Sequence, residues 1–140
     1  MNDQYLSYKH IKAMGWISII ISILGALVFL YSVLEGTVSF LGALPVLLLS
    51  LFGIYAGNET LKNTRKGKKL LSIFFAIQIV SVITPTFYII LNVGLSLGFH
   101  FTAGASKVSI NVIAFIMFLI CLRMLREHKH ITQKKSDVAA

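Results

Sequence analysis

Charged side chains are scarce in this sequence. Of its 140 residues, 13% are Asp, Glu, Lys or Arg, whereas 56% are hydrophobic. A soluble domain usually carries about 25% charged residues, and a domain this small exposes much of its surface to water. The shortage of charge therefore excludes an ordinary soluble domain and predicts an integral membrane protein.

Reactive side chains are equally few. Cys121 is the single cysteine, which excludes an intramolecular disulfide, a CxxC redox pair and a thiolate metal cluster; free cysteine is commonly buried, so we expect a packed, unreactive thiol. His128 and His130 lie two residues apart without a third ligand at metal spacing. We therefore expect no metal, no other cofactor and no enzymatic activity.

Four apolar runs are long enough to cross a bilayer, which takes roughly 20 residues per helix. Their middles contain no Asp, Glu, Lys, Arg or His, the groups that mark catalytic or coupled-transport sites inside a membrane. The sequence predicts one all-α membrane domain over 1–140, with four transmembrane helices in an antiparallel bundle. We expect these spans at about 13–34, 38–57, 70–91 and 108–125.

The distribution of basic residues predicts the orientation. Lys and Arg accumulate in short cytoplasmic segments, and an arrangement with both termini inside leaves 12 of the 13 on that side, with Lys107 outside. The basic loop 58–69 and the tail 126–140 are then cytoplasmic. The glycine-rich and aromatic segment 92–107 is the largest outer part, and the titratable residues of the outer side are Glu35, His100 and Lys107.

Small residues form stripes on the first two spans. Ser18, Ser22 and Gly25 share one face of the first span. Ser50, Gly53 and Gly57 follow i, i+3, i+7 spacing on the second, where Gly53 and Gly57 also form a GxxxG pair. Such stripes allow close helix contacts. The pattern is compatible with packing within the chain or between subunits.

Uncharged polar residues interrupt the last two spans. In hydrocarbon each needs a hydrogen-bond partner. They either join helices to one another or line a polar cavity, and the residues concerned are Gln78, Ser81, Thr84 and Asn111.

Basic residues flank the membrane on the predicted inner side. Each basic residue of a polybasic segment contributes about 1 kcal/mol of binding free energy to a membrane that contains anionic lipid. The alternative is that these charges only set the topology. The residues expected to contact anionic head groups are Arg65, Lys66, Lys68, Lys69, Arg123 and Arg126. No aromatic interleaving or recognised module accompanies them, so nucleic acid is not an expected partner.

The arrangement from Gly53 to Leu71, a glycine-bearing span end followed by a short basic loop and a new apolar run, resembles that of small bacterial membrane proteins. The resemblance implies a multi-pass protein of the bacterial inner membrane. Two four-span families are excluded by residue. Small multidrug transporters depend on a glutamate inside the first span, whereas Glu35 lies at its end, and quinone-linked thiol oxidoreductases need several cysteines.

Three functions remain as hypotheses. The first is a non-enzymatic accessory, partner-binding or immunity-type protein that contacts lipid, a membrane protein partner or further copies of itself. The second is a small oligomeric transporter or channel with a polar path along the third span. The third, a lipid-modifying enzyme using Glu59, His128 or His130, has no supporting residue spacing.

Overall fold

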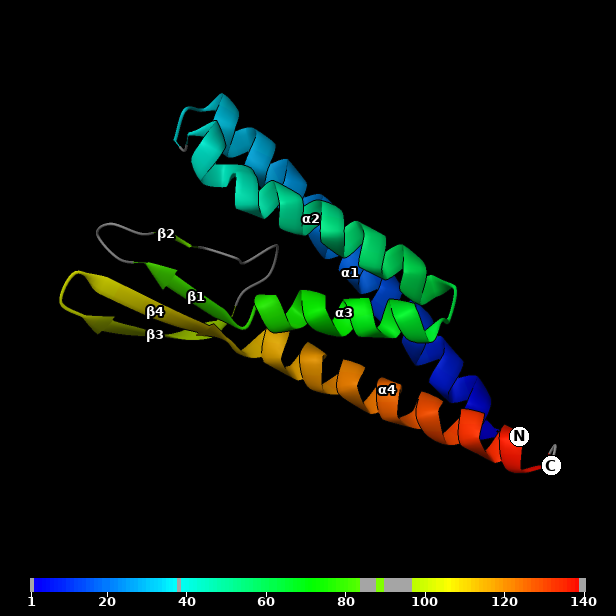
Figure 1. The fold of residues 1–140 in the computed structure, drawn as a ribbon. Coiled ribbons are helices and arrows are strands. Elements are labelled where there is room, and N and C mark those ends of the chain that lie inside the picture. Colours follow the sequence, from blue (N-terminus) through cyan, green and yellow to red (C-terminus); the bar gives the residue numbers. More distant parts are fainter. Residues whose placement is uncertain (1, 38, 84–87, 90–96, 139–140) are drawn as a thin grey trace.

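The computed structural model describes residues 2–37, 39–83, 88–89 and 97–138. Within them the chain is mostly helical, as predicted, but it also contains a four-stranded sheet, so the all-α class is wrong (Figure 1). The elements are α1 Asn2–Leu34, α2 Phe40–Leu61, α3 Arg65–Ile77, β1 Val80–Ile83, β2 Tyr88–Ile89, β3 Gly98–Ala103, β4 Ser106–Asn111 and α4 Val112–Val138.

Helices α1 and α2 form an antiparallel hairpin (Figure 1). The turn begins at Gly36, whose φ of 68° is the left-handed conformation that commonly ends a helix. Its backbone N–H donates to the Val33 carbonyl at 3.1 Å, and the Thr37 hydroxyl donates to the Ser32 carbonyl at 2.9 Å. The carbonyl groups at the end of α1 are thus hydrogen-bonded within the turn itself.

Two helical segments are long and apolar enough to cross a membrane, judged by length and composition. They are Lys9–Leu34 in α1 and Leu44–Leu61 in α2, and they cover most of the first two expected spans. No other helix in the described parts of the chain meets the same criterion. Pro45 lies inside α2, as expected, and the helix continues through it.

In the described part of the expected helix over 70–91, namely 70–83 and 88–89, the prediction is wrong beyond Ile77. Helix α3 ends there with Gln78 as its C-cap, and strand β1 begins at Val80. The reason lies in the composition of the segment after Gln78, where β-branched residues dominate. Such side chains lose rotamer freedom in a helix and favour strands. Pro85 also opposes a helix, because its ring would clash with the carbonyl four residues earlier, that of Ser81.

The boundaries around the last span and the basic loop also differ from expectation. Residues 108–111 belong to β4, and α4 starts at Val112 and continues to Val138, through most of the expected tail. In the basic segment, α3 already begins at Arg65 because Thr64 caps it, its hydroxyl accepting from the Gly67 N–H at 2.9 Å. The loop expected over 58–69 is therefore only the short turn 62–64.

The sheet is antiparallel throughout, with strand order β2-β1-β4-β3. Strands β3 and β4 form a hairpin in which Ala103 pairs with Ser106, leaving a two-residue turn. Gly104 occupies the first turn position with φ of 60°, as a type II′ turn requires. The described part of the expected outer segment, 97–107, thus forms β3 and the start of β4.

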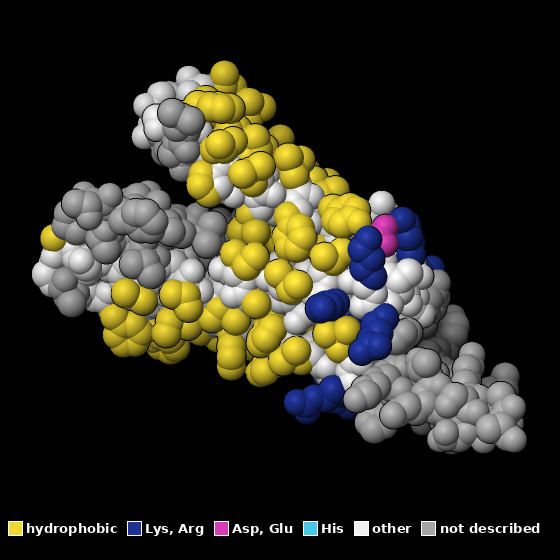
Figure 2. Space-filling model, in the orientation of Figure 1, with side chains coloured by type: hydrophobic (Ala, Val, Ile, Leu, Met, Phe, Trp, Pro, Cys, Tyr) yellow, Lys and Arg dark blue, Asp and Glu magenta, His cyan; other side chains and the backbone are white. Residues whose placement is uncertain are grey.

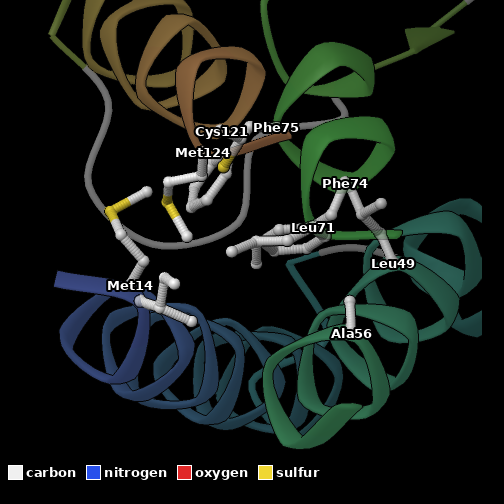
Figure 3. Close-up of a cluster of buried hydrophobic side chains, with 9 residues drawn as sticks. Met14, Leu49, Ala56, Leu71, Phe74, Phe75, Cys121 and Met124 are labelled. Carbon is white, nitrogen blue, oxygen red and sulfur yellow. The ribbon is translucent and has the colours of Figure 1, made fainter. Parts of the chain in front are cut away.

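The hydrophobic core lies where all four helices meet (Figure 3). Phe74 and Leu71 of α3 are fully buried in its centre, with Phe52 and Phe75 packed against the Phe74 ring. Cys121 of α4 is also completely buried here. Helix α3 is therefore the central element that joins the α1–α2 hairpin to α4.

The turns and termini of the chain gather at two opposite ends of the molecule. The N-terminus, the C-terminal part of α4 and the α2–α3 turn lie toward one end (Figure 1). The α1–α2 turn and the β3–β4 turn lie toward the opposite end (Figure 1). We call these the basic end and the turn end.

Candidate functional site

The small-residue stripes lie in the contact between α1 and α2. The Ser18 hydroxyl donates to the Gly53 carbonyl across the two helices at 2.9 Å. A Cβ added at Gly53 would collide with the Ser22 hydroxyl and the Phe74 ring, and one added at Gly57 would lie 2.7 Å from the Gly15 carbonyl oxygen. Only glycine permits so close an approach. All six stripe residues are buried, including Gly25 and Ser50.

Two hydroxyls in this contact differ in their bonding. Ser50 donates to the Val46 carbonyl of its own helix at 2.8 Å. The Ser22 hydroxyl is completely buried and has no hydrogen-bond partner within the described residues. Gly15, which completes the α1 stripe one turn before Ser18, was missed from the sequence, although its i, i+3, i+7 relation to Ser18 and Ser22 is the signal that would have revealed it.

The polar residues of the last two expected spans gather where helix changes to strand. Gln78 ends α3: its backbone N–H donates to the Phe75 carbonyl at 3.1 Å and its amide to the Phe74 carbonyl at 3.3 Å. Asn111 is the last residue of β4 and caps the start of α4, where its side-chain oxygen accepts from the Ala114 N–H at 3.2 Å. The Asn111 N–H donates to the Ile79 carbonyl at 2.7 Å. The junction is thereby tied together by backbone and side chain.

Ser81 lies beside this junction, on β1, opposite Ser109 of β4. Its side chain is buried, and its hydroxyl has no hydrogen-bond partner in the part of the chain that the structure describes. Thr84, the fourth residue of the polar set, falls outside the described residues. The structure therefore brings Gln78, Ser81 and Asn111 to one place, at the ends of α3 and α4.

The titratable residues of the turn end lie on different elements. Glu35 follows α1 and accepts a hydrogen bond from Tyr31, and no ion pair joins it to Lys107 within the described residues. Lys107 is exposed on β4, and His100 pairs with Ser109 in the β3–β4 ladder.

Basic side chains gather at the basic end (Figure 2). The exposed ones of the predicted lipid-contact set are Arg65, Lys66, Lys69, Arg123 and Arg126. The prediction that Lys68 contacts anionic lipid does not agree with the structure. Its side chain is 3% exposed, and a contact with head groups needs an exposed ammonium group. Lys68 follows Gly67, which packs so closely on α2 that an added Cβ would lie 2.6 Å from the Thr60 nitrogen. That close approach turns the next residue inward.

The ammonium groups of Lys66 and Lys62 contact side chains of α2. The Lys66 ammonium donates to the Tyr55 hydroxyl at 3.3 Å and lies 5.9 Å from the ring centroid. Lys62 pairs with Glu59 at 2.5 Å, and this hydrogen bond and the carboxylate charge raise the pKa of Lys62. Both pairs are exposed, so they orient the α2–α3 turn and add little stability.

Within the described residues, no three His, Cys, Asp or Glu side chains come together as a metal site. What the arrangement offers is an apolar body with a basic end, a close helical hairpin and a buried polar junction. Comparison of the chain with protein-family models, curated proteins and solved structures finds no match.

Proposed function

We propose that the chain is a multi-pass membrane protein with four crossings and a cytoplasmic basic end, and that it acts as a non-enzymatic accessory or partner-binding protein. The observation that carries the proposal is the segregation of charge. On the face drawn in Figure 2, the described Lys and Arg side chains lie toward one end, and hydrophobic side chains cover much of the other described surface. Lys107 on β4 is an exposed lysine outside that end. In a bilayer this division corresponds to cytoplasm and hydrocarbon.

The apolar exposure supports a lipid environment over water. Large hydrophobic side chains lie exposed along α1 from Trp16 to Leu34, on α2 at Leu48 and Leu51, and on α4. Monomeric soluble proteins rarely expose contiguous apolar patches beyond a few hundred Å². The buried contacts inside α1–α2 are instead made by small and polar residues, as is typical of helices that pack in membranes.

The third and fourth crossings are composite in this proposal. Helix α3 contributes apolar residues only from Leu70 to Ile77, and the chain continues as β1. Helix α4 contributes Val112 to Leu122 and is preceded by β4. Each crossing would thus begin as helix at the basic end and finish as strand at the turn end.

The partner would be anionic lipid at the basic end together with a membrane protein or further copies of this chain. An immunity-type protein, which protects a bacterial inner membrane against a membrane-active toxin, is one form of such a role. The described residues contain no group of three His, Cys, Asp or Glu side chains that could hold a metal ion, and the expected spans contain no ionisable group in their middles; both observations support binding over chemistry.

A transporter or channel with a polar path along the third span is the alternative. It needs Gln78, Ser81 and Asn111 to face solute. Gln78 and Asn111 both complete the ends of helices and are buried within one chain. Those contacts explain their position without a solute path, so the accessory role is preferred.

Cysteine labelling tests the topology. In a Cys121→Ser background, Thr37→Cys and Ala105→Cys place a thiol at the turn end, and Lys9→Cys and Lys69→Cys place one at the basic end; all four positions are exposed. We expect an impermeant maleimide to label the first pair on intact cells and the second pair only after permeabilisation. Labelling of a basic-end position on intact cells would contradict the orientation.

The accessory role is tested separately, by crosslinking in native membranes followed by purification. We expect a specific protein or anionic lipid to remain associated, and charge reversal of Arg65, Lys69 and Arg123 to release the lipid. A solitary monomer without bound protein or lipid would refute the role. Vesicle flux lost on Gln78→Leu would favour the transporter.

A further inference from the structure

The antiparallel sheet has one apolar face and one polar face. Directly paired residues of antiparallel strands lie on the same side of a sheet. The pairs Phe99–Ile110, Phe101–Val108 and Val80–Ile110 therefore share a face, which we call the apolar sheet face and define as Val80, Phe99, Phe101, Val108 and Ile110. Because side chains alternate along a strand, Ser81, Thr102, Lys107 and Ser109 belong to the opposite, polar sheet face.

The apolar sheet face is exposed. Phe99 and Phe101 are 67% and 60% exposed, and the other members of the apolar sheet face are exposed as well. On the polar sheet face Ser81 is buried and Ser109 is half-buried, whereas Thr102 and Lys107 are exposed. A half-buried sheet in water turns its apolar side to the core, but here the apolar side is exposed. The apolar sheet face therefore needs an apolar environment outside the chain.

The exposed hydrophobic surface of α4 is continuous with the apolar sheet face. Among the α4 residues whose exposure is described, 112–126, the large exposed hydrophobic ones form a stripe of Phe115, Ile116, Leu119 and Ile120. Hydrophobic side chains continue from the sheet onto α4 and end where Lys and Arg begin (Figure 2). The stripe ends at Arg123, which is exposed. The apolar sheet face is thus the outer continuation of the surface that α4 presents to lipid in the proposed topology.

The dimensions fit a bilayer. With 1.5 Å per helical residue and about 3.3 Å per strand residue, Ile110 lies about 23 Å and Val108 about 30 Å along the chain axis from Arg123. The hydrocarbon core is about 30 Å thick. Strand β4 is paired on both sides, whereas β3 is an edge strand. A free strand edge must reach water or head groups, so head groups must reach inward to the level of Phe99, which pairs with Ile110 about 23 Å from Arg123.

We propose that the apolar sheet face rests in lipid at the outer boundary of the bilayer, with acyl chains as its occupant and Phe99 deeper than Phe101. The apolar sheet face is continuous with the exposed α4 stripe, so a second copy of the chain would have to cover both surfaces with one interface. Lipid covers both surfaces without a specific protein–protein interface. The inference rests on the proposed function, because it takes the basic end as cytoplasmic.

Fluorescence quenching by lipids brominated on their acyl chains tests the inference. Trp16 is the single tryptophan, so Trp16→Phe provides a tryptophan-free background for Phe99→Trp, Phe101→Trp and the control Thr102→Trp on the polar sheet face. In phosphatidylcholine–phosphatidylglycerol vesicles we expect the first two to emit at shorter wavelength and to lose most of their fluorescence, with position 99 better quenched by deep bromines. Thr102→Trp should keep most of its fluorescence.

Two results would overturn the inference while leaving the proposed function standing: quenching of native Trp16 without quenching at 99 and 101, or equal quenching at 101 and 102. If Trp16 also escapes quenching, the membrane proposal itself fails.

A spin label on Phe101→Cys or Thr102→Cys, in a Cys121→Ser background, gives a second measurement that does not depend on tryptophan substitutions. We expect collision with oxygen at 101 and with a water-soluble nickel complex at 102; rapid disulfide dimers of Phe101→Cys would assign the face to a second copy.

Discussion

The first and second halves of the chain contain apolar runs of similar length, yet they fold differently. Residues up to Leu61 form two long helices, whereas the later runs divide into helix and strand at Gln78 and Asn111. β-branched residues alone do not explain the difference, because α1 stays helical through 17–23, where five of seven residues are isoleucine. In the later half the β-branched residues of β1 pair with β4, and Gln78 and Asn111 cap the adjoining helix ends. Hydropathy alone does not distinguish a continuous span from a composite one.

The largest expected effect concerns the close contact in the first half. Gly53→Leu would place a branched side chain where even a Cβ collides with Ser22 and the Phe74 ring. Overpacking of a close contact typically costs about 1–3 kcal/mol and occasionally more, and we expect the upper end here. The free energy of unfolding, measured by titration with sodium dodecyl sulfate in mixed micelles, should fall accordingly.

The matched control for this substitution is Ala13→Leu, which adds a similar volume at an exposed position of α1. It should leave the unfolding free energy nearly unchanged. If Gly53→Leu were equally harmless, α1 and α2 would not be packed as closely as the glycine contacts require.

The hairpin could be predicted from sequence because its signals are local and repeated. The charge-free length of each run, the three-residue joint around Gly36 and the spacing of Ser50, Gly53 and Gly57 all refer to neighbouring turns. The change to strand at Val80 depends on pairing with β4, about 30 residues away along the chain. Length and hydropathy cannot report such a pairing, which is why a single helix over 70–91 was the wrong expectation.

The candidate site shows the same division. The sequence predicted that Gln78 and Asn111 have partners inside the protein, because they are polar residues in apolar runs, and both are buried. It did not predict that they lie at helix ends, because this depends on where the strands begin. Lys68 was misplaced for a related reason. Its inward position results from the close packing of Gly67 on α2, a tertiary contact that a basic run does not reveal.

A smaller effect is expected at the strand-to-helix junction of the second half. Asn111→Ala removes the side-chain oxygen that accepts from the Ala114 N–H at the start of α4. Loss of an N-cap costs about 1 kcal/mol, and the unfolding free energy should fall by about that amount. Asn111→Asp retains an acceptor and should preserve more of the stability than Asn111→Ala.

Asn58→Ala, at an exposed position near the end of α2, serves as the control for that substitution. Hydrogen exchange of the first α4 amides should increase in Asn111→Ala alone. Unchanged exchange there would mean that the cap does not hold the composite crossing together.

The smallest effect compares two serines one turn apart in the first half. Ser18 donates to the Gly53 carbonyl, whereas Ser22 is buried with no hydrogen-bond partner in the described structure. Interhelical hydrogen bonds in membranes contribute about 0.6 kcal/mol on average, so Ser18→Ala should lower the unfolding free energy by about that much. Ser22→Ala removes a buried hydroxyl for which the described structure shows no hydrogen-bond partner. An unpaired buried polar group is costly, so Ser22→Ala should leave stability unchanged or raise it. Equal losses in both variants, measured in the same detergent titration, would show that Ser22 bonds across the hairpin and that the contact is more polar than its geometry indicates.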